Sequence, residues 1–349
     1  MKFSTLTKAN AAGSIPLLLS LARSFVTPLY RANFLVAALD KGVLQQLSVG
    51  PRDVDTLADA LGITGDRQLL RAWLDLGVRF GELKVSNGRY RLGSRRAKAL
   101  ARPRNDSVAA ALEEVVRFHV PVLLNAPAMM QSGTRLSMSD QDGSIIARSS
   151  RIVEPFLEEA AERVLPRNVP VRLLEIGCGS GVYVRHAASL NPQLTALAID
   201  YQADVAGVAA ANVADWGLAQ RVEVRQADVR ELTSVEGFDL ITMHNNIYYF
   251  DKQERTDLLE HVRSLLKPGG QLLLTTACKG GNLSTEVLGL WFEFADFGGP
   301  LPDSGELAAQ MQDAGFVEVE VRRLIPGEQF CSFVGSSPSP HPDAQEPPS

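Results

Sequence analysis

The segment 173–181 reads LLEIGCGSG, and it decides the fold of the chain. Its first four residues are suited to a buried strand, and glycines follow at Gly177, Gly179 and Gly181, with a helical pattern directly after them. Glycine is needed where backbone turns sharply off the end of a strand and approaches a ligand closely. The segment therefore predicts a strand, a ligand-binding loop and a helix, in that order.

Strand and helix patterns alternate from residue 171 onward, which is typical of a mostly parallel, doubly wound sheet. The predicted strands are 171–176, 194–199, 221–226, 238–243, 271–276, 316–323 and 328–334. The predicted helices include 182–190, 203–216, 252–266 and 304–314. This order predicts an α/β domain with a seven-stranded sheet, whose first strand carries the glycine loop.

The first part of the chain has a different, mostly helical pattern. Apolar spacing predicts helices over 32–47, 53–61 and 66–79. The dipeptide Asn87–Gly88 predicts a two-residue turn between strands 83–86 and 89–92, because Asn-Gly tolerates the positive φ that such a turn needs. Three helices followed by a hairpin form a winged-helix pattern.

These patterns predict four parts of the chain. Residues 1–106 are expected to form the winged-helix domain, 107–170 a helical linker that supplies pocket helices, 171–336 the α/β domain, and 337–349 a tail. The last fifteen residues are rich in Pro and Ser and almost devoid of large apolar side chains. Such a segment cannot bury enough surface to order itself, so we expect it to be disordered.

Composition limits the class of protein. The 349 residues carry a net charge of −5, which argues against a nucleic-acid partner because phosphate contacts need a concentrated basic face. The three cysteines are scattered, as expected in a reducing cytoplasm. No apolar run approaches the roughly 18 residues that span a bilayer, and SIPLLLSLA at 14–22 is predicted to be a helix of the folded protein. We therefore expect a cytoplasmic protein without a membrane partner.

The glycine loop is also informative in its spacing. A nicotinamide-binding fingerprint would place its third glycine where Val182 stands, whereas this chain has G-x-G-x-G preceded by Glu175. That arrangement resembles the first motif of class I methyltransferases that depend on S-adenosylmethionine (SAM). The resemblance implies a Rossmann-like methyltransferase domain in which Glu175 helps hold the methionine ammonium group and Gly177 and Gly179 pass under the cofactor.

Further elements follow where that family has them. The strand LTALAID ends at Asp200, whose carboxylate can accept hydrogen bonds from both ribose hydroxyls, and RVEVRQAD ends at Asp228, the family's position for the adenine amino group. We interpret Cys178, inside the loop, as a tolerated residue rather than a nucleophile. The cofactor contacts that the resemblance implies are Glu175, Gly177, Cys178, Gly179, Gly181, Asp200, Tyr201, Asp228, Val229 and His244.

Two functions are open for the N-terminal part. A winged helix can bind DNA, but helix 66–79 interleaves aspartates and a large apolar face with its arginines, whereas a DNA reader concentrates positive charge. The string YRANFLVAALDKGVLQQL at 30–47, with the hairpin, resembles instead the dimerisation domain of small-molecule O-methyltransferases. This resemblance implies a homodimer.

The acceptor side departs from that family. Aligning FDLITMHNNIYYFDKQER at 238–255 places Tyr248 and Tyr249 where the family has its His-Asp base pair. His244, four residues earlier, is either a catalytic base or a residue that packs on the cofactor. The residues predicted to line the acceptor pocket are Asn245, Asn246, Tyr248, Tyr249, Trp291 and Phe294, although Trp291 and Phe294 are equally suited to a core.

The sequence thus predicts a SAM-dependent methyltransferase for a small, hydrophobic or aromatic acceptor, with no cluster at metal-ligand spacing. O-methylation is the first expectation, but the missing base pair leaves a carboxylate, carbon or amine acceptor open. Two alternatives belong to other classes. One is a winged-helix DNA-binding regulator or scaffold with a degenerate methyltransferase fold, and the other is a SAM-binding enzyme with different chemistry, such as decarboxylation or hydroxylation.

Overall fold

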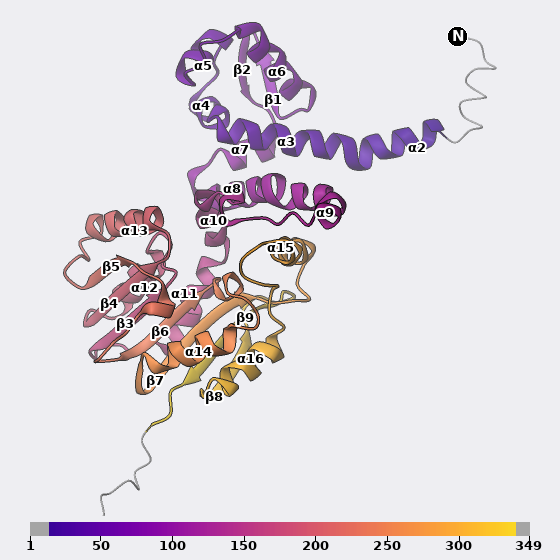
Figure 1. The fold of residues 1–349 in the computed structure, drawn as a ribbon. Coiled ribbons are helices and arrows are strands. Elements are labelled where there is room, and N and C mark those ends of the chain that lie inside the picture. The colour runs from indigo at the N-terminus through magenta and orange to yellow at the C-terminus, as the bar shows by residue number, and fades with distance from the viewer. Residues whose placement is uncertain (1–13, 340–349) are drawn as a thin grey trace, which may run out of the picture. The chain divides into compact units, whose positions relative to one another are not determined.

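The computed structural model describes residues 14–339 and divides the chain into two units, which meet between Arg117 and Phe118. The first unit is mostly helical, and the second contains the large sheet (Figure 1). Within residues 14–339, no helix is both long enough and apolar enough to cross a membrane.

The first unit contains the predicted hairpin and helices close to two of the three predicted ones, those over 53–61 and 66–79. Its elements are α2 (Ser14–Leu21), η1 (Ala22–Val26), α3 (Thr27–Asp40), α4 (Val43–Val49), α5 (Val54–Ala60), α6 (Arg67–Arg79), β1 (Leu83–Ser86), β2 (Arg89–Leu92), α7 (Arg95–Leu100), η2 (Pro103–Asn105) and α8 (Asp106–Glu114). The hairpin has the predicted bounds, with Ser86 paired to Arg89 across the Asn87–Gly88 turn. Asp53 and Asp66 cap α5 and α6 by accepting hydrogen bonds from backbone N–H groups.

The prediction of one helix over 32–47 is wrong. The segment is divided between α3 and α4 by Gly42, whose φ of 73° is left-handed. The Gly42 N–H bonds to the carbonyl of Leu39 and closes α3 there. The apolar pattern continues on both sides of Gly42, so periodicity alone does not reveal the break.

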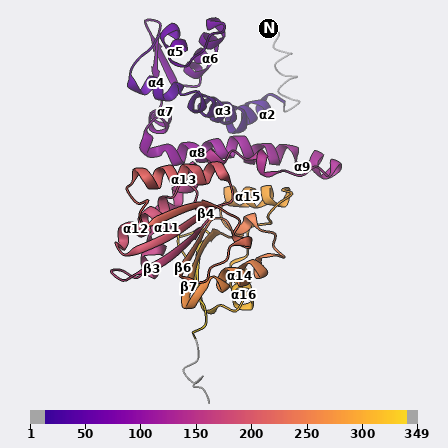
Figure 2. The same ribbon diagram turned by 60° about the vertical axis from the view of Figure 1, so that its left-hand side comes forward.

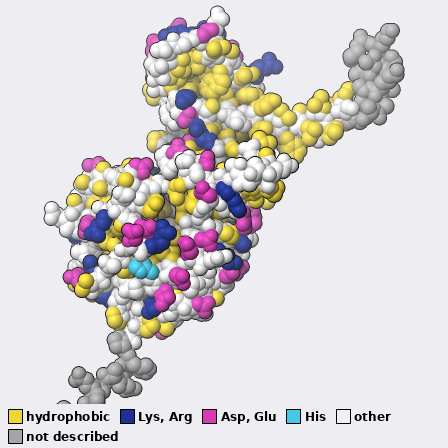
Figure 3. Space-filling view, in the orientation of Figure 1, with side chains coloured by type: hydrophobic (Ala, Val, Ile, Leu, Met, Phe, Trp, Pro, Cys, Tyr) yellow, Lys and Arg dark blue, Asp and Glu magenta, His cyan; other side chains and the backbone are white. Residues whose placement is uncertain are grey.

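The start of the first unit carries an exposed apolar surface. Helices α2, η1 and α3 follow one another without a break, and hydrophobic side chains gather over them (Figure 3). Leu18 and Phe25 are 65% and 67% exposed, and Leu29 and Tyr30 are also exposed. The core of the unit lies elsewhere, around buried residues that include Leu44, Leu57, Leu74 and Tyr90. We call the exposed surface of residues 17–30 the α2–α3 apolar face.

The second unit begins with helices and continues as an α/β domain. Before the sheet lie η3 (Val115–His119, which crosses the boundary between the units), α9 (Val120–Ser132), η4 (Met138–Asp140), α10 (Gly143–Ser149), η5 (Ser150–Val153) and α11 (Glu154–Val164). The remaining elements are β3 (Val171–Ile176), α12 (Val182–Leu190), β4 (Leu194–Asp200), α13 (Ala203–Asp215), β5 (Val222–Gln226), η6 (Val229–Glu231), β6 (Phe238–His244), η7 (Ile247–Tyr249), α14 (Arg255–Ser264), β7 (Leu266–Ala277), α15 (Leu283–Glu293), α16 (Ser304–Asp313), β8 (Val317–Arg323) and β9 (Phe330–Ser336).

The seven strands form one sheet in the order β5-β4-β3-β6-β7-β9-β8, which confirms the predicted α/β class. Figure 2 shows the central strands β4, β3, β6 and β7 of this sheet. Strands β5, β4, β3, β6 and β7 run parallel to one another, whereas β9 is antiparallel to both β7 and β8. The chain runs outward from β3 to β5 on one side and from β6 to β7 on the other. Strands β3 and β6 therefore flank a topological switch point, where the carboxyl ends of parallel strands leave a crevice for ligands.

Helices cover both faces of the sheet. On one face α11, α12 and α13 pack on β3, β4 and β6 around Leu173, Val184, Ala209 and Leu240. On the other face α14 and α16 bury Ile241, Met243 and Leu272 together with their own apolar residues. Successive side chains of a strand alternate between the two faces, so residues of β6 with even numbers near its end share the α11–α12 face.

The predicted tail, 337–349, starts before the ordered part of the chain ends. Strand β9 extends to Ser336, and Ser337 is buried and pairs through its backbone with Gly269 and Gly270. The backbone hydrogen bonds of the sheet therefore hold residues whose side chains could not order themselves. The prediction for residues 340–349 lies outside the described residues.

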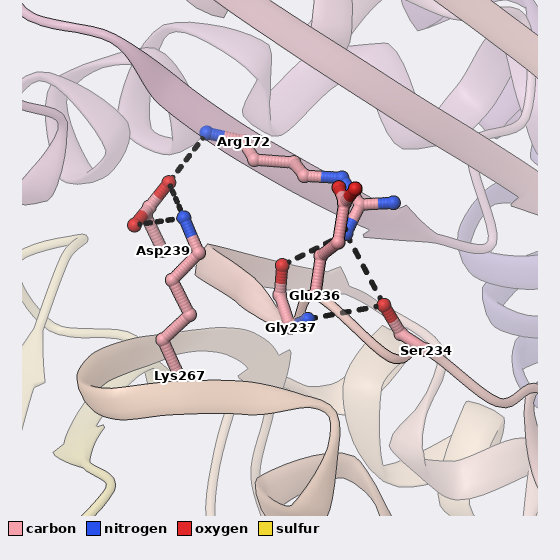
Figure 4. Close-up of polar contacts among 6 residues, drawn as sticks. All are labelled: Arg172, Ser234, Glu236, Gly237, Asp239 and Lys267. Atoms are coloured by element: carbon pink, nitrogen blue, oxygen red, sulfur yellow. Dashed lines mark hydrogen bonds and ion pairs between the residues drawn. The ribbon is translucent and has the colours of Figure 1, made fainter.

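At the amino ends of β3, β6 and β7, polar groups form a closed network (Figure 4). The carboxylate of Asp239 accepts hydrogen bonds from the Arg172 backbone N–H at 2.7 Å and from Lys267 Nζ at 2.8 Å. The Arg172 guanidinium donates to Ser234 Oγ and to the Gly237 carbonyl, and its carbon lies 4.5 Å from the centre of the Phe238 ring. We call this group the amino-edge network.

Candidate active site

The glycine loop leaves β3 at the switch point in the predicted order. Gly177, Gly179 and Gly181 have φ values of 70°, 55° and 81°, which only glycine adopts at little cost, and α12 starts directly after them. The N–H groups of Gly177 and Cys178 donate to the carbonyl of Ile199 in β4, so the loop is fixed to the neighbouring strand. No heavy atom lies within 4 Å of a Cβ built at Gly179. The loop therefore presents open backbone to a ligand.

Glu175 lies inside the sheet just before this loop. It is 1% exposed, and its Oε1 atom has no hydrogen-bond partner. Burial, together with the nearby charge of Asp200, raises the pKa of the Glu175 carboxyl to about 8. A buried carboxylate without a partner is costly, so this position favours a ligand that brings positive charge.

Asp200 ends β4 beside the loop. Its Oδ2 accepts a hydrogen bond from Gly179 N–H and its Oδ1 from Gln202 N–H, each at 3.1 Å. Burial raises the pKa of this carboxyl above its usual value, while the backbone donors lower it. Each oxygen keeps further acceptor capacity, so the carboxylate can bind a pair of neighbouring hydroxyls.

The residues expected to contact adenine already have partners or lie apart from the loop. The Asp228 carboxylate is held by Arg230, whose Nη2 lies 2.6 Å from Oδ2, and this contact lowers the pKa of Asp228. Val229 is buried in the core that α14 covers. Tyr201, after β4, is 63% exposed. A ligand that donates a hydrogen bond to the Asp228 carboxylate would thus share that carboxylate with Arg230.

Cys178 is placed as a structural residue. It is buried, and it packs with Val184 and Ala209 on the α12–α13 face. Burial raises the pKa of its thiol far above the usual range, so the thiolate is suppressed. This agrees with the interpretation that Cys178 is not a nucleophile.

His244 lies at the end of β6 on the α11–α12 face. Its Nδ1 shares a hydrogen bond of 2.8 Å with Thr275 Oγ1, and its ring is 4.9 Å from that of Tyr183. The ring borders a cavity of about 10 Å³ together with Glu175 and Thr242. Burial lowers the pKa of His244 to about 4, so the imidazole is neutral near pH 7.

Asn245 and Asn246 follow His244 and turn back toward the glycine loop. Asn245 has a φ of 53°, and its N–H donates to the Thr275 carbonyl. Asn246 Nδ2 donates to the Ile176 carbonyl at 2.6 Å, while its buried Oδ1 has no partner. A Cβ at Gly177 would meet Asn246 Nδ2 at 2.7 Å. The structure therefore places Asn246 against the glycine loop.

An aromatic cluster lies beyond the end of β6, where η7 meets α15. The ring of Tyr248 is 4.9 Å from that of Phe292, and the ring of Tyr249 stacks on that of Phe297 at 6.0 Å. Trp291 is buried and contacts both phenylalanines. We call Tyr248, Tyr249, Trp291, Phe292 and Phe297 the aromatic cluster.

The aromatic cluster contains two residues that the sequence analysis did not single out. Phe292 and Phe297 contribute to most of its ring contacts, whereas the predicted Phe294 is partly buried and packs at its margin. The signal was the spacing of large rings in WFEFADF, which does not say which rings turn inward. Tyr249 also donates from its hydroxyl to Gln141 Oε1 at 3.3 Å.

Among residues 14–339, no group of three or more His, Cys, Asp and Glu side chains is arranged to hold a metal ion. The open backbone and the unpartnered carboxylate oxygen centre the chemistry that the geometry indicates on the switch point. The candidate site has two parts. The first is the open backbone of the glycine loop with the carboxyl groups of Glu175 and Asp200, which suits a ligand that carries both an amine and a ribose. The second is the aromatic cluster.

Comparisons with known proteins agree with this geometry. A family model described as a methyltransferase domain matches residues 174–272. The chain is 24% identical over 327 residues to 3-hydroxy-5-methyl-1-naphthoate 3-O-methyltransferase of Streptomyces sahachiroi, which covers 88% of this chain and 92% of the relative. It is 23% identical over 321 residues to demethylspheroidene O-methyltransferase of Rhodobacter capsulatus, covering 86% of this chain and 77% of the relative.

Solved structures show the same fold across both units. Mitomycin 7-O-methyltransferase superposes with a TM-score of 0.71 at 19% identity, covering 95% of this chain and 99% of that one. Human N-acetylserotonin methyltransferase, solved with SAM, superposes with a TM-score of 0.70 at 15% identity, covering 92% of this chain and 98% of that one.

The fold, the glycine loop and its two carboxylates are those of a class I SAM-dependent methyltransferase. Within the class, the chain is similar over nearly its whole length to small-molecule O-methyltransferases that carry an N-terminal helical domain. The cofactor is SAM.

Proposed function

We propose that the chain methylates a hydroxyl group of a small, apolar, aromatic acceptor that is held by the aromatic cluster. The observation that carries this proposal is the cluster itself, which is positioned just past the end of β6 by η7 and α15. Tyr248, Trp291 and Phe292 are buried, whereas the rings of Tyr249 and Phe297 are only partly buried and leave apolar surface for a stacked or T-shaped contact with another aromatic molecule. Of the relatives named above, one acts by its name on a hydroxynaphthoate, an aromatic hydroxyl compound, which supports an acceptor of this kind. Demethylspheroidene and mitomycin, which the other two names give, extend the range to other small organic acceptors.

For the cofactor we propose that different residues around the glycine loop bind different parts of SAM. The unpartnered Oε1 of Glu175 binds the ammonium group, and Asp200 accepts the ribose hydroxyls. Open space at Gly179 admits the ligand close to the backbone. Cys178 and Gly181 shape the loop, while Tyr201, Asp228 and Val229 lie on the adenine side. When bound, SAM supplies a methyl group already activated by a positive sulfonium.

The chain contributes alignment and exclusion of water rather than proton transfer. The described members of the aromatic cluster carry no imidazole or carboxylate, since Tyr248 and Tyr249 occupy the positions of the family's base pair. His244 lies on the α11–α12 face with its Nδ1 bonded to Thr275, so we assign it a packing role beside Glu175 rather than the role of base. Because the aromatic cluster offers no imidazole or carboxylate to take up the proton, we infer that the acceptor hydroxyl ionises in water and that the acceptor reaches the enzyme as an anion.

Two probe acceptors of similar size test this: 2-naphthol and its 6-cyano derivative, which differ in the acidity of the hydroxyl. We expect release of S-adenosylhomocysteine with both, and we expect the midpoint of kcat/KM against pH to move with the acidity of the acceptor. A common midpoint for both acceptors would show that the enzyme supplies a base. Failure to methylate either one would remove the aromatic hydroxyl from the proposal.

We also propose that the protein is a cytoplasmic homodimer. The α2–α3 apolar face is a continuous surface of large exposed hydrophobic side chains, which a soluble protein normally covers. A second copy of the chain is the partner that the resemblance to O-methyltransferases supports. Light scattering with the Phe25→Glu variant tests it: wild-type protein should have the mass of a dimer, and the variant should dissociate. A monomeric wild-type protein would contradict the proposal.

A further inference from the structure

Arg255, the first residue of α14, is buried and joins two segments of the chain. It is only 1% exposed, although its side chain is charged. Its Nε donates to the Phe250 carbonyl at 3.2 Å, and its Nη2 donates to the Pro300 carbonyl at 2.8 Å. Burial of a charge is costly unless it is well bonded, so a guanidinium placed here indicates that the two carbonyls need to be held together.

A second link joins the same two segments. The Gly299 N–H donates to the Tyr248 carbonyl at 3.0 Å. Gly298 has a φ of 67°, and a Cβ there would lie 2.4 Å from that same carbonyl oxygen. The backbone of residues 298–300 is thus packed directly against η7, with no room for a side chain between them.

These segments carry opposite sides of the aromatic cluster. Tyr248 and Tyr249 belong to η7, which ends next to Phe250. Phe297 precedes the Gly298–Pro300 segment, and its ring stacks on that of Tyr249. The spacing between the two sides is therefore set at their bases, by Arg255 and by the contact at Gly298, and not by the rings alone.

We propose that Arg255 is a positioning residue, which fixes the distance between η7 and the 297–300 segment and so aligns the acceptor with the methyl group. This rests on the proposed function in one respect, namely that the aromatic cluster holds the acceptor. Arg255 does not touch the acceptor in this proposal. It acts through the two backbone segments, and misplacement of a substrate by about 1 Å can cost a large factor in rate.

The alternative is that Arg255 only stabilises the fold, and a matched control separates the two. Arg221 is also an arginine that bonds to backbone carbonyls of the second unit: its Nη1 donates to Pro192 at 3.0 Å and to Leu194 at 3.3 Å. Arg221 immediately precedes β5, at the amino end of the sheet and away from the aromatic cluster beyond the carboxyl end of β6. Arg221→Lys should therefore cost stability without changing the alignment of an acceptor.

The test compares Arg255→Lys, Gly298→Ala and Arg221→Lys with the wild type. Lysine keeps the charge but loses the planar fork that bonds both carbonyls. Alanine at Gly298 pushes on the Tyr248 carbonyl while Arg255 stays intact. We measure SAM affinity by calorimetry, backbone hydrogen exchange of residues 246–252 and 296–302, and kcat and KM with 6-cyano-2-naphthol.

We expect both Arg255→Lys and Gly298→Ala to speed exchange in the two segments and to lower kcat about tenfold, with SAM affinity within about twofold of the wild type. Arg221→Lys should leave all three measurements unchanged. Exchange and kcat equal to wild type in Arg255→Lys would overturn the proposal, as would an equal loss of kcat in Arg221→Lys. A wild-type protein inactive on both naphthols would refute the acceptor proposal, and the exchange data would then decide whether Arg255 fixes the two segments.

Discussion

The two ends of the parallel strands differ in how completely their polar groups are hydrogen-bonded. At the amino ends, Asp239 accepts from Arg172 and Lys267, and Arg172 is further bonded to Ser234 and Gly237 (Figure 4). At the carboxyl ends, buried oxygens of Glu175, Thr242 and Asn246 have no partner. Buried polar groups are normally satisfied, and those that are not require an explanation. The comparison indicates that a ligand binds at the edge of the sheet where buried polar atoms lack hydrogen-bond partners.

Cavity size alone would point to the amino ends of the strands rather than to the proposed site. A hollow of about 550 Å³ lies beside the amino-edge network and includes Arg172, Arg221 and Arg225. Each of these arginines already bonds to a neighbour: Arg172 to Gly237, Arg221 to carbonyls, and Arg225 to Glu223. The cavity that Glu175 borders is only about 10 Å³, yet Glu175 and Thr242, each with an unsatisfied oxygen, both line it. Unsatisfied chemistry is the better guide to the site.

The largest effect should come from Asp200→Ala. Asp200 is expected to accept two hydroxyls of the bound ribose, and a hydrogen bond to a charged group contributes about 1.5–3 kcal/mol. We therefore expect SAM affinity to fall by at least about 100-fold, measured by isothermal titration.

The matched control is Asp239→Ala at the opposite edge. It removes a carboxylate that is also bonded to backbone N–H, but by our account it faces no ligand. SAM should bind to this variant as it binds to the wild type. Equal losses in both variants would show that the measurement reports stability, and the contrast between the two edges would be lost.

The next effect concerns pH. The carboxyl of Glu175 has a pKa of about 8 in the free protein, raised by burial and by Asp200, so it is protonated at neutral pH. A cationic ligand favours the carboxylate, so binding should release a proton, and affinity should rise about tenfold for each pH unit from 6 toward 8 and then level off. Titration in buffers with different heats of ionisation counts the proton, and Glu175→Gln should abolish both the release and the slope.

The sign for stability is opposite in the free protein. The pKa of Glu175 is raised on folding from 4.5 to about 8, so its contribution to stability is fully present below pH 4.5 and is lost as pH rises through 8. Bound SAM should reverse that loss. If the stability that SAM adds did not increase between pH 6 and 8, the assignment of the ammonium group to Glu175 would be wrong.

Local patterns predicted most of the sheet and the cofactor loop. Strands β3, β4 and β6 end within one residue of their predicted ends, because their apolar runs and glycine punctuation are local features. Strand β7 begins at Leu266 rather than at 271, although Pro268 and two glycines normally interrupt a strand. Pairing of Leu266 with Phe238, and of Gly269 and Gly270 with Ser337, continues the ladder across them. Such pairing is tertiary and is not visible in the pattern.

The acceptor side was predictable only in part. The change from His-Asp to Tyr248-Tyr249 could be read from an aligned motif. The inward rings of Phe292 and Phe297, and the contacts of Arg255 with a carbonyl far along the chain, could not. Helical spacing also placed α14 from residue 252, whereas it starts at Arg255 after a turn closed by Asp251 and Glu254. These features depend on which distant segments meet, and residue type alone does not determine that.

A smaller effect is expected from a pair of glycines, one at each edge. Gly177 and Gly237 have φ values of 70° and 68°, and a Cβ would be crowded by Asn246 in the first and by Lys267 in the second. Alanine in a left-handed conformation costs about 1–2 kcal/mol, so both Gly177→Ala and Gly237→Ala should lose about that much stability in chemical denaturation. Only Gly177→Ala should also bind SAM about tenfold more weakly, since we propose that only that loop contacts the ligand. Loss of SAM affinity in Gly237→Ala would break the comparison.

The smallest effect should come from Asp239→Asn, which keeps the shape of the amino-edge network but removes the charge. Asp239 and Lys267 are more than a third exposed, so solvent screens their ion pair, and the bond from Arg172 N–H to an amide oxygen survives. We expect a loss of about 1 kcal/mol in the free energy of unfolding, which high salt should reduce, with SAM affinity and kcat unchanged. A change in SAM affinity would mean that the amino edge communicates with the switch point through β3 and β6. The two edges would then be parts of one functional unit rather than a stabilising end and a binding end.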